Sequence, residues 1–505
     1  MTSTMLFTMR SRCAVTLAVA ASALTGLTVT GSAALGSPAS AAPGSRPVHD
    51  LDGDRSDDVV VGAMGRLGLR LSTAGLVRLE ATASSFSAES MAIGDFDGDG
   101  DDDLAGGDPW ATVGGVSGAG EVWVLPGATG GPNTGAVTRI HQDVAGVPDD
   151  AERGDHFGAA LAAADFDGDG FDDLAIGTPD EGIESRGVRA AGSVTVIPGS
   201  ASGLVLDDGR LVVQVVTAAP ELPEPEDRLG TALAAGDVTG DGVADLAVTA
   251  PGDRAEGARE SRRGAVFLMP GATARGVTGT TASVVRADDL TRLLAAAGFD
   301  GGLAVADVTG DGHAEVVTGT WGRGCGGVFV LRGGGGGIRA ASAQYLDQES
   351  PGVPGACEIG EFWGAVVAAG DLTGDGHAEV VVGNPSESVG DREAAGAYLV
   401  LRGSAAGVST AGSVMVTQDS THVSDRVESG DHFAAAVALH DLDGDRRADV
   451  VVGAPAERVD GELTGWVAGL LSGPDGRVSA TAFTFTGRDL GTSGVPVWGV
   501  GKPIG

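Results

Sequence analysis

Short apolar runs alternate with glycine-rich polar turns from about residue 44 to the end of the chain. The turn signals recur about every 8–12 residues, which is typical of proteins built from short β-strands. Nowhere is an apolar period of about 3.6 residues sustained long enough to predict a helix. The pattern of hydrophobic and polar positions therefore predicts an all-β protein.

The apolar runs recur in a fixed order of four predicted strands. The first strand begins with a large apolar residue followed by glycine or alanine, at Phe157, Leu229, Trp363 and Phe433. The second ends near Gly-x-Pro, as in residues 177–179. The third ends at a glycine, over residues 121–127, 193–199, 265–271, 327–333 and 397–403, and a less regular fourth strand follows.

An acidic phrase lies between the first and second predicted strands of each unit, and it is clearest in residues 165–173. Aspartates occupy its positions 1, 3, 5 and 9, and glycines occupy positions 4 and 6. The phrase begins at Asp50, Asp95, Asp165, Asp237, Asp307, Asp371 and Asp441, at intervals of 45, 70, 72, 70, 64 and 70 residues. Repetition at a nearly fixed period indicates a repeat architecture. Seven units of four strands predict a seven-bladed β-propeller, which leaves only short, protected sheet edges.

The two ends of the chain complement one another. Residues 494–499 resemble residues 352–354 and 362–364, a phrase that elsewhere precedes an acidic loop. Immediately before the loop at Asp50, only residues 46–49 are available as a strand, which is too few for a first strand. We therefore predict that residues of about 495–504 supply the inner strand of the Asp50 blade, so that N- and C-terminal segments pair and close the ring.

The acidic phrase has the composition of a cation site. Alternating carboxylates on a tight turn can converge on one ion, and Ca²⁺ takes six to eight oxygen ligands at about 2.3–2.6 Å. Without a cation these carboxylates would repel one another. Gly170 is expected to take a positive φ at the sharp turn. The phrase is not an EF-hand, because its position 12 is Ile176 and not a bidentate glutamate.

Phe157-Gly158 and Gly177-Thr178-Pro179, placed around residues 165–173, resemble the FG-GAP repeat. This is the repeat of the integrin α-chain N-terminal β-propeller and of many exported bacterial proteins. The resemblance covers about residues 46–505 and implies a seven-bladed propeller with calcium between the first two strands of its blades. In integrins only some blades carry the acidic loop, whereas here all seven have a version.

The resemblance and the loop geometry together assign side chains at positions 1, 3, 5 and 9, and the backbone carbonyl of position 7, as ligands of up to seven mainly structural Ca²⁺ ions. The expected ligands are Asp50, Asp52, Asp54 and Asp58; Asp95, Asp97, Asp99, Asp101 and Asp103; Asp165, Asp167, Asp169, Phe171 and Asp173; Asp237, Thr239, Asp241, Val243 and Asp245; Asp307, Thr309, Asp311, His313 and Glu315; Asp371, Thr373, Asp375, His377 and Glu379; and Asp441, Asp443, Asp445 and Asp449.

Individual loops are expected to differ in affinity. Threonine at position 3 removes one charge from three of them, and fewer charged ligands weaken calcium binding. Arg55 and Arg446 replace the position-6 glycine in the first and last loops and bring a positive charge close to the site. The rings of His313 and His377 are expected to point to solvent, because position 7 coordinates through its carbonyl.

The N-terminus predicts export. Residues 1–41 combine Arg10 and Arg12, an apolar stretch over 14–29 and an Ala-x-Ala ending at Ala41, which is the pattern of a secretory signal peptide. The propeller would then occupy residues 42–505. No run of 18 or more apolar residues follows, so the sequence predicts no membrane anchor. Cys325 and Cys357 remain after cleavage and are expected to form a disulfide in an oxidising compartment, with two free buried thiols as the alternative.

Charge and motifs restrict the function. The formal net charge is −37, which excludes a general surface for nucleic acid or anionic membranes. The chain contains no Gly-x-Ser-x-Gly, His-Glu-x-x-His or Cys-x-x-Cys motif, and no acidic pair stands out as a glycosidase dyad. Arg153-Gly154-Asp155 occupies the same repeat position as residues 429–431, which favours a structural turn over a cell-binding peptide.

The leading hypothesis is a secreted, monomeric, calcium-binding module for adhesion to a protein or glycan. The alternative is a calcium-dependent polysaccharide lyase or other hydrolytic enzyme on the same scaffold, and a third hypothesis is a structural coat component. A lyase needs a base beside arginine, and the candidate bases outside the loops and leader are Tyr345, Tyr398, His141, His156, His422 and His432. No catalytic residue is assigned, and the ligand and the binding face stay open.

Overall fold

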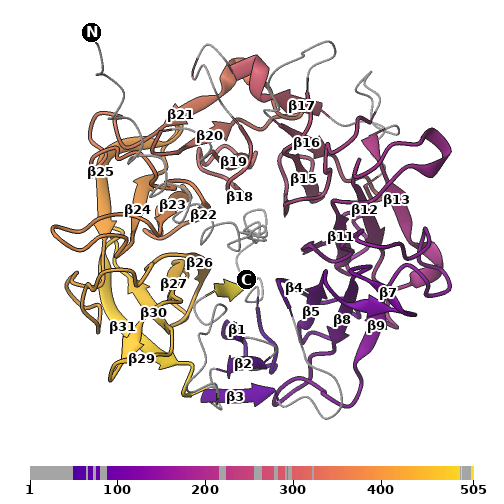
Figure 1. The fold of residues 1–505 in the computed structure, drawn as a ribbon, viewed down its shortest axis with the longest axis horizontal. Coiled ribbons are helices and arrows are strands. Elements are labelled where there is room, and N and C mark those ends of the chain that lie inside the picture. Colours follow the sequence, from indigo (N-terminus) through magenta and orange to yellow (C-terminus); the bar gives the residue numbers. More distant parts are fainter. Residues whose placement is uncertain are drawn as a thin grey trace, which may run out of the picture.

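Seven four-stranded antiparallel sheets are arranged around a central axis in the computed structural model of the protein (Figure 1). The structure describes residues 49–63, 66–71, 75–79, 88–214, 223–254, 264–277, 283–290, 293, 298–320, 324–489, 491 and 502–504. The prediction of an all-β, seven-bladed propeller with four strands per blade is confirmed. The predicted signal peptide, residues 1–41, lies outside the described residues.

The blades follow one another in chain order. The first comprises β32 (Lys502–Ile504), β1 (Val59–Ala63), β2 (Arg66–Leu71) and β3 (Gly75–Leu79). The second comprises β4 (Ser90–Gly94), β5 (Asp103–Asp108), β8 (Glu121–Leu125) and β9 (Thr138–Ile140), and the third β10 (Ala160–Ala164), β11 (Asp173–Thr178), β12 (Ser193–Ile197) and β13 (Arg210–Val212). The fourth comprises β14 (Leu233–Gly236), β15 (Asp245–Ala250), β16 (Ala265–Met269) and β17 (Ser283–Arg286).

The fifth blade comprises β18 (Leu303–Ala306), β19 (Glu315–Thr320), β20 (Gly327–Leu331) and β21 (Gln344–Leu346). The sixth comprises β22 (Val366–Gly370), β23 (Glu379–Asn384), β24 (Ala397–Arg402) and β25 (Ser409–Val416), and the seventh β26 (Ala436–His440), β27 (Asp449–Ala454), β30 (Trp466–Ser472) and β31 (Val478–Thr486). Two hairpins project from second-to-third-strand connections: β6 (Thr112–Val113) with β7 (Val116–Ser117), and β28 (Arg458–Val459) with β29 (Glu462–Leu463).

Helical structure in the described residues consists of short 3₁₀ turns, η1 (Glu184–Arg186), η2 (Leu206–Asp208), η4 (Ala287–Leu290) and η5 (Ala340–Ser342). Within this part of the chain, no helix combines the length and the apolar character that a membrane span requires.

The last described strand completes the first blade, as the sequence predicted. β32 pairs antiparallel with β1, with Val60 opposite Ile504, Val61 opposite Pro503 and Gly62 opposite Lys502. It lies near the centre of the ring, where the inner strands of the other blades lie (Figure 1). The predicted segment 495–504 is thereby confirmed over residues 502–504, and residues 495–501 lie outside the described residues.

The large apolar residue that begins four of the units is buried between two blades. Phe157, Leu229, Trp363 and Phe433 are all 0% exposed. The backbone N–H of Phe157 donates to the carbonyl of Ala119 just before the third strand of the preceding blade, at 3.0 Å, and the other three make equivalent bonds. Each such residue therefore fills the space between sheets and fixes the register of one blade against the next.

The antiparallel order defines two faces of the ring. Connections from first to second and from third to fourth strands lie on one face, which we call the loop face because it carries the seven acidic loops. Connections from second to third strands, and from one blade to the next, lie on the other, which we call the opposite face.

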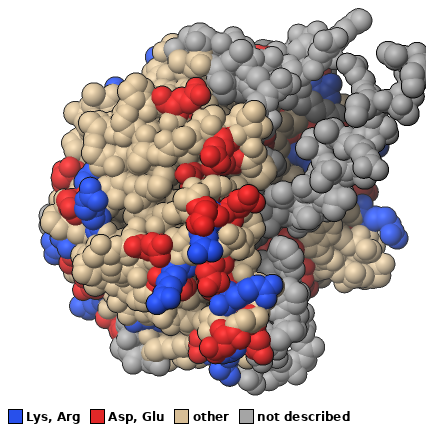
Figure 2. All heavy atoms as spheres, turned by 60° about the vertical axis from the view of Figure 1, so that its left-hand side comes forward, with Lys and Arg blue, Asp and Glu red and all other residues tan. Residues whose placement is uncertain are grey.

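Figure 2 shows acidic side chains interleaved with arginines on the side in view, without a continuous basic surface there.

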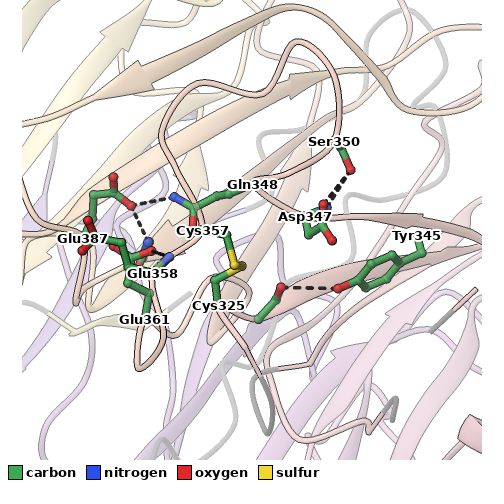
Figure 3. Close-up of a disulfide and its surroundings, with 11 residues drawn as sticks. Cys325, Tyr345, Asp347, Gln348, Ser350, Cys357, Glu358, Glu361 and Glu387 are labelled. Carbon is green, nitrogen blue, oxygen red and sulfur yellow. Dashed lines mark hydrogen bonds between the residues drawn. A yellow bond between two sulfur atoms is a disulfide. The ribbon is translucent and has the colours of Figure 1, made fainter. Parts of the chain in front are cut away.

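Cys325 and Cys357 form a disulfide, with an S–S distance of 2.15 Å and a Cα–Cα distance of 5.1 Å. The prediction of this pairing is confirmed. The bond joins the start of β20 to the segment that leads into the sixth blade, so it links two neighbouring blades on the opposite face (Figure 3).

Candidate metal centres

In the third to sixth blades, the position-1 aspartate organises the acidic loop by accepting backbone N–H groups of the same loop. In the third blade, Asp165 Oδ1 accepts the N–H groups of Gly168 at 2.6 Å and Asp169 at 3.1 Å, and Oδ2 accepts that of Gly170 at 2.9 Å. Asp237, Asp307 and Asp371 make the same set of bonds in their loops. Gly170 has a φ of 94°, as predicted. Because the turn is held by its first side chain, the later oxygens are presented in fixed positions.

The position-9 carboxylate has a second role that the sequence reasoning missed. Asp173 Oδ2 accepts the N–H of Phe166 at 3.1 Å, and Oδ1 accepts the N–H of Gly199 at 2.9 Å. Gly199 is the glycine that ends the third strand, and a Cβ there would lie 2.3 Å from the carbonyl oxygen of Asp172. Asp103 and Asp245 make equivalent bonds, to Gly127 and Gly271. Asp449 accepts the N–H groups of Leu442 and Ser472 in the same way, with serine in place of the glycine. The closing glycines were visible in the sequence and mark this link between the loop and the third strand.

The donor set of the third loop fits a hard cation. Asp165, Asp167 and Asp173 each offer a carboxylate oxygen, and these atoms all lie within 4.8 Å of one another. Asp167 Oδ1 is buried without a hydrogen-bond partner. Burial, and next the charges of neighbouring aspartates, raise the pKa of Asp167, and burial raises that of Asp173 to about 7. A divalent ion would coordinate the unpaired oxygen and offset the repulsion.

The first and second loops bring together oxygens in the same way. Asp50, Asp52 and Asp58 form one such group, and Asp95 and Asp97 form another with Asp99. Calcium binding at all seven loops stays a prediction.

Glutamate replaces aspartate at position 9 in the fifth and sixth loops and reaches the same backbone groups. Glu315 Oε2 accepts the N–H of Val308 at 3.0 Å, and Glu379 Oε2 accepts that of Leu372 at 3.1 Å. Burial raises the pKa of each glutamate to about 7. The longer side chains thus keep the loop architecture.

The histidine rings at position 7 are half-buried against the neighbouring loop and do not extend freely into solvent, which corrects the sequence prediction. The ring of His313 lies against Gly240 of the preceding loop, and that of His377 lies against Gly310. The Nδ1 atoms of both rings are buried without a hydrogen-bond partner. Position 7 therefore covers the neighbouring loop, an inter-blade contact that one repeat read in isolation does not reveal.

The acidic loops are also hydrogen-bonded to one another around the ring. Asp172, at position 8 of the third loop, accepts the N–H of Asp95 through Oδ2 at 3.0 Å. Asp57 of the first loop accepts the N–H of Asp441 of the last loop through Oδ2 at 2.8 Å, so the same contact spans the junction between the two chain ends. Position 8 was not assigned a function from the sequence.

The opposite face carries an exposed aromatic residue within a polar network. Trp110 is 54% exposed, and its ring packs edge-on against His156 with the ring centroids 4.3 Å apart. His156 Nδ1 lies 2.7 Å from Asp180 Oδ2, and Arg228 Nε lies 3.1 Å from Asp180 Oδ1. Ile359, which is 96% exposed, lies on the same face in the connection between the fifth and sixth blades.

The Arg-Gly-Asp tripeptide is a turn, as predicted. Asp155 is only 3% exposed, and its Oδ2 accepts the backbone N–H of Glu152 at 2.6 Å. The carboxylate is therefore directed into the protein and not toward a partner.

The FG-GAP repeat model matches residues 87–125, 157–197, 229–269, 363–400 and 433–467. Mouse integrin alpha-X is 33% identical over 183 residues, which are 35% of this chain and 14% of that protein. Drosophila melanogaster integrin alpha-PS2 is 33% identical over 217 residues, 40% of this chain and 14% of that protein. Rat phosphatidylinositol-glycan-specific phospholipase D is 32% identical over 161 residues, 32% of this chain and 18% of that protein. The chain thus spans less than a fifth of the length of these relatives.

Among solved structures, the Bacillus licheniformis rhamnogalacturonan lyase PL11 matches at a TM-score of 0.31 and 14% identity over 80% of this chain and 88% of that one. The Vibrio cholerae biofilm matrix protein Bap1 matches at a TM-score of 0.25 and 13% identity over 90% and 79% of the two chains. The FG-GAP repeat matches, the integrin alpha relatives and the seven blades together support an integrin-like FG-GAP β-propeller.

Proposed function

We propose that this protein is an exported binding module whose acidic loops hold Ca²⁺ to brace the blades and whose opposite face binds a protein or glycan ligand. The observation that carries the binding role is the position of Trp110 and Ile359. These exposed apolar side chains both lie in connections of the opposite face, away from the acidic loops. Loops on a rigid scaffold are the usual place for recognition, and tryptophan beside polar groups suits a wet interface.

Export is supported by the leader-like N-terminus and by the disulfide. Disulfides persist in oxidising compartments and are rare in reducing ones. The role of calcium is supported by the crowded carboxylates and the buried, unpaired Asp167 Oδ1.

The binding role is tested on protein and glycan arrays, with Ca²⁺ and with chelator. Trp110→Ala should weaken capture of any retained ligand at least tenfold, whereas the control Thr112→Ala, on the neighbouring β6, should leave it unchanged. Chelator should also reduce capture by loosening the blades. Equal binding by the wild type and the Trp110 variant would refute the assignment of this face.

The calcium role is tested by counting bound ions and by thermal denaturation. Asp167→Asn should remove one equivalent of Ca²⁺. A site filled at 100 times its dissociation constant contributes about 2.7 kcal/mol of stability, so chelation of several sites should lower the Tm clearly. An unchanged Tm in chelator would contradict the bracing role.

The geometry does not favour the lyase alternative over binding. Tyr398 is 1% exposed in the core of the sixth blade. Tyr345 and Arg332 line a cavity of about 410 Å³, but burial raises the pKa of Tyr345 further above its usual value, which makes the phenol a poor base. Unsaturated products from a uronic-acid polymer would nevertheless show lyase activity.

A further inference from the structure

A second acidic arrangement recurs on the opposite face, at junctions between successive blades. A glutamine just after the fourth strand of one blade is followed 39 residues later by an acidic residue just after the second strand of the next. The four pairs are Gln142 with Glu181, Gln214 with Asp253, Gln348 with Glu387 and Gln418 with Glu457. Each of these glutamines is at most 4% exposed. The four junctions thus share a buried amide that contacts a buried carboxylate.

Further carboxylates converge on these pairs. Glu152, Asp155 and Glu181 offer oxygens that all lie within 4.8 Å of one another, and so do Glu428, Asp431 and Glu457. Backbone groups hold the carboxylates in place: Glu181 Oε1 accepts the N–H of Gly182 at 2.9 Å, as Glu457 Oε1 accepts that of Arg458. In the junction next to the disulfide, Gln348, Glu358, Glu361 and Glu387 lie together in the same manner (Figure 3).

The glutamine amides leave a buried oxygen without a partner. Gln142 Nε2 donates to Glu181 Oε2 at 2.6 Å, and Gln418 Nε2 donates to Glu457 Oε2 at 2.8 Å. The Oε1 atoms of both glutamines are buried and have no hydrogen-bond partner. A buried acceptor without a partner destabilises the folded state. A half-turn of the amide would place Oε1 beside the carboxylate, where a cation between the two oxygens would be coordinated by both.

The junction between the third and fourth blades shows what neutralises such a carboxylate. Asp253 Oδ2 accepts from Gln214 Nε2 at 3.1 Å, and its Oδ1 accepts from Arg286 Nε at 3.0 Å. The guanidinium thus supplies a positive charge within this junction. Among the described residues, neither Glu181 nor Glu457 forms an ion pair with an arginine or lysine. In the described part of the chain, Glu181 and Glu457 thus lack the counter-charge that Arg286 supplies to Asp253.

We propose that the Glu152–Asp155–Glu181 and Glu428–Asp431–Glu457 clusters are divalent-cation sites, separate from the acidic loops, in which Gln142 and Gln418 supply an amide oxygen. An all-oxygen set with three carboxylates suits a hard ion such as Ca²⁺ and not a thiolate-preferring metal. Each ion would join residues from two successive blades, so it would clamp the ring on the face opposite the acidic loops. This inference does not depend on the ligand of the proposed binding face.

The test counts ions bound to the full mature chain. Calcium is measured by mass spectrometry after dialysis at a fixed free concentration, for the wild type, Glu181→Gln, Glu457→Gln and the double variant. Each single substitution should remove one equivalent and the double variant two. Asp253→Asn, at the junction that Arg286 already neutralises, is the matched control and should remove none. A double variant that keeps the wild-type stoichiometry would overturn the proposal, because the clusters would then hold protons.

A second measurement does not depend on the folding of the variants. Crystals of the wild type soaked in Mn²⁺ should show anomalous density between Glu181 and Asp155 and between Glu457 and Asp431. Density at the acidic loops with none at either cluster would also overturn the proposal.

Discussion

Removal of residues 502–505 should open the ring at the first blade. The truncation deletes β32 and with it a ladder of three residue pairs against β1. At about 1 kcal/mol net per hydrogen bond, this loss amounts to about 2–3 kcal/mol. Val59, Val60 and Val61 are all 0% exposed, and uncovering on the order of 100 Å² of apolar surface here costs a further ~2.5 kcal/mol. The total is about 5 kcal/mol.

The expected change in Tm follows from the size of the protein. At about 2.1 cal/mol/K per residue, a cooperative unit of roughly 450 residues has an unfolding entropy of ~1 kcal/mol/K, so the truncation should lower the Tm by about 5 °C. The truncation should lower the local stability of β1 more than the global stability, because β1 loses one of its two neighbouring strands. Its amides should exchange with solvent at least about a hundredfold faster, since about 1.4 kcal/mol corresponds to a factor of ten in an opening equilibrium.

Differential scanning calorimetry and hydrogen exchange at fixed Ca²⁺ measure the two effects. Lys502→Gln is the control, because it changes a side chain of β32 and keeps the backbone pairing; its Tm should match that of the wild type. A truncated protein with an unchanged Tm and unchanged exchange in β1 would refute the role of this strand in closure.

Three further predictions concern single contacts. Asp57→Ala removes the bond to the N–H of Asp441 and should cost about 1.5–3 kcal/mol, as for hydrogen bonds to charged groups; chemical denaturation should show it, and a loss below about 0.5 kcal/mol would contradict it. Replacing Cys325 and Cys357 by serine opens a loop with a sequence separation of 32 and should cost about 3–4 kcal/mol; reduction of the wild type should give the same Tm as the variant. Burial raises the pKa of Asp227 from 3.8 to about 6, so the folded form binds this proton more tightly than the unfolded chain. The contribution of Asp227 to stability is therefore present below pH 3.8 and is lost as the pH rises to about 6. Asp227→Asn should therefore raise the Tm more at pH 8 than at pH 4.5, and equal shifts at both values would argue against the burial effect.

The sequence was sufficient to predict the fold because each blade repeats the same local signals. The acidic phrase with its glycines marked every first turn, and the glycine that ends the third strand marked the far edge of the same site. The pairing of the two terminal segments was predictable because residues 494–499 repeat a phrase that elsewhere precedes an acidic loop, while the loop at Asp50 lacks a strand immediately before it. These features depend on residues close together in the chain.

Contacts between blades could not be predicted in the same way. The ring of His313 covers Gly240, 73 residues earlier, a distance that only the curvature of the propeller brings to contact. The pairing of Gln142 with Glu181 was also missed, although its spacing of 39 residues recurs in four junctions. The spacing was present in the sequence. The glutamine and the acidic residue of each pair belong to different blades, however, and they do not form a short continuous motif like the acidic phrase.

The strand that completes the first blade comes very late in the chain. Gly62 and Lys502 are partners although they are 440 residues apart. Contacts so distant in sequence form slowly, because the intervening chain loses its conformational entropy before the strand pairing stabilises the structure. Until that happens, β1 presents an unpaired edge, and such edges recruit strands from other molecules. The same geometry that seals one ring could therefore join two chains into an exchanged dimer when the protein folds at high concentration.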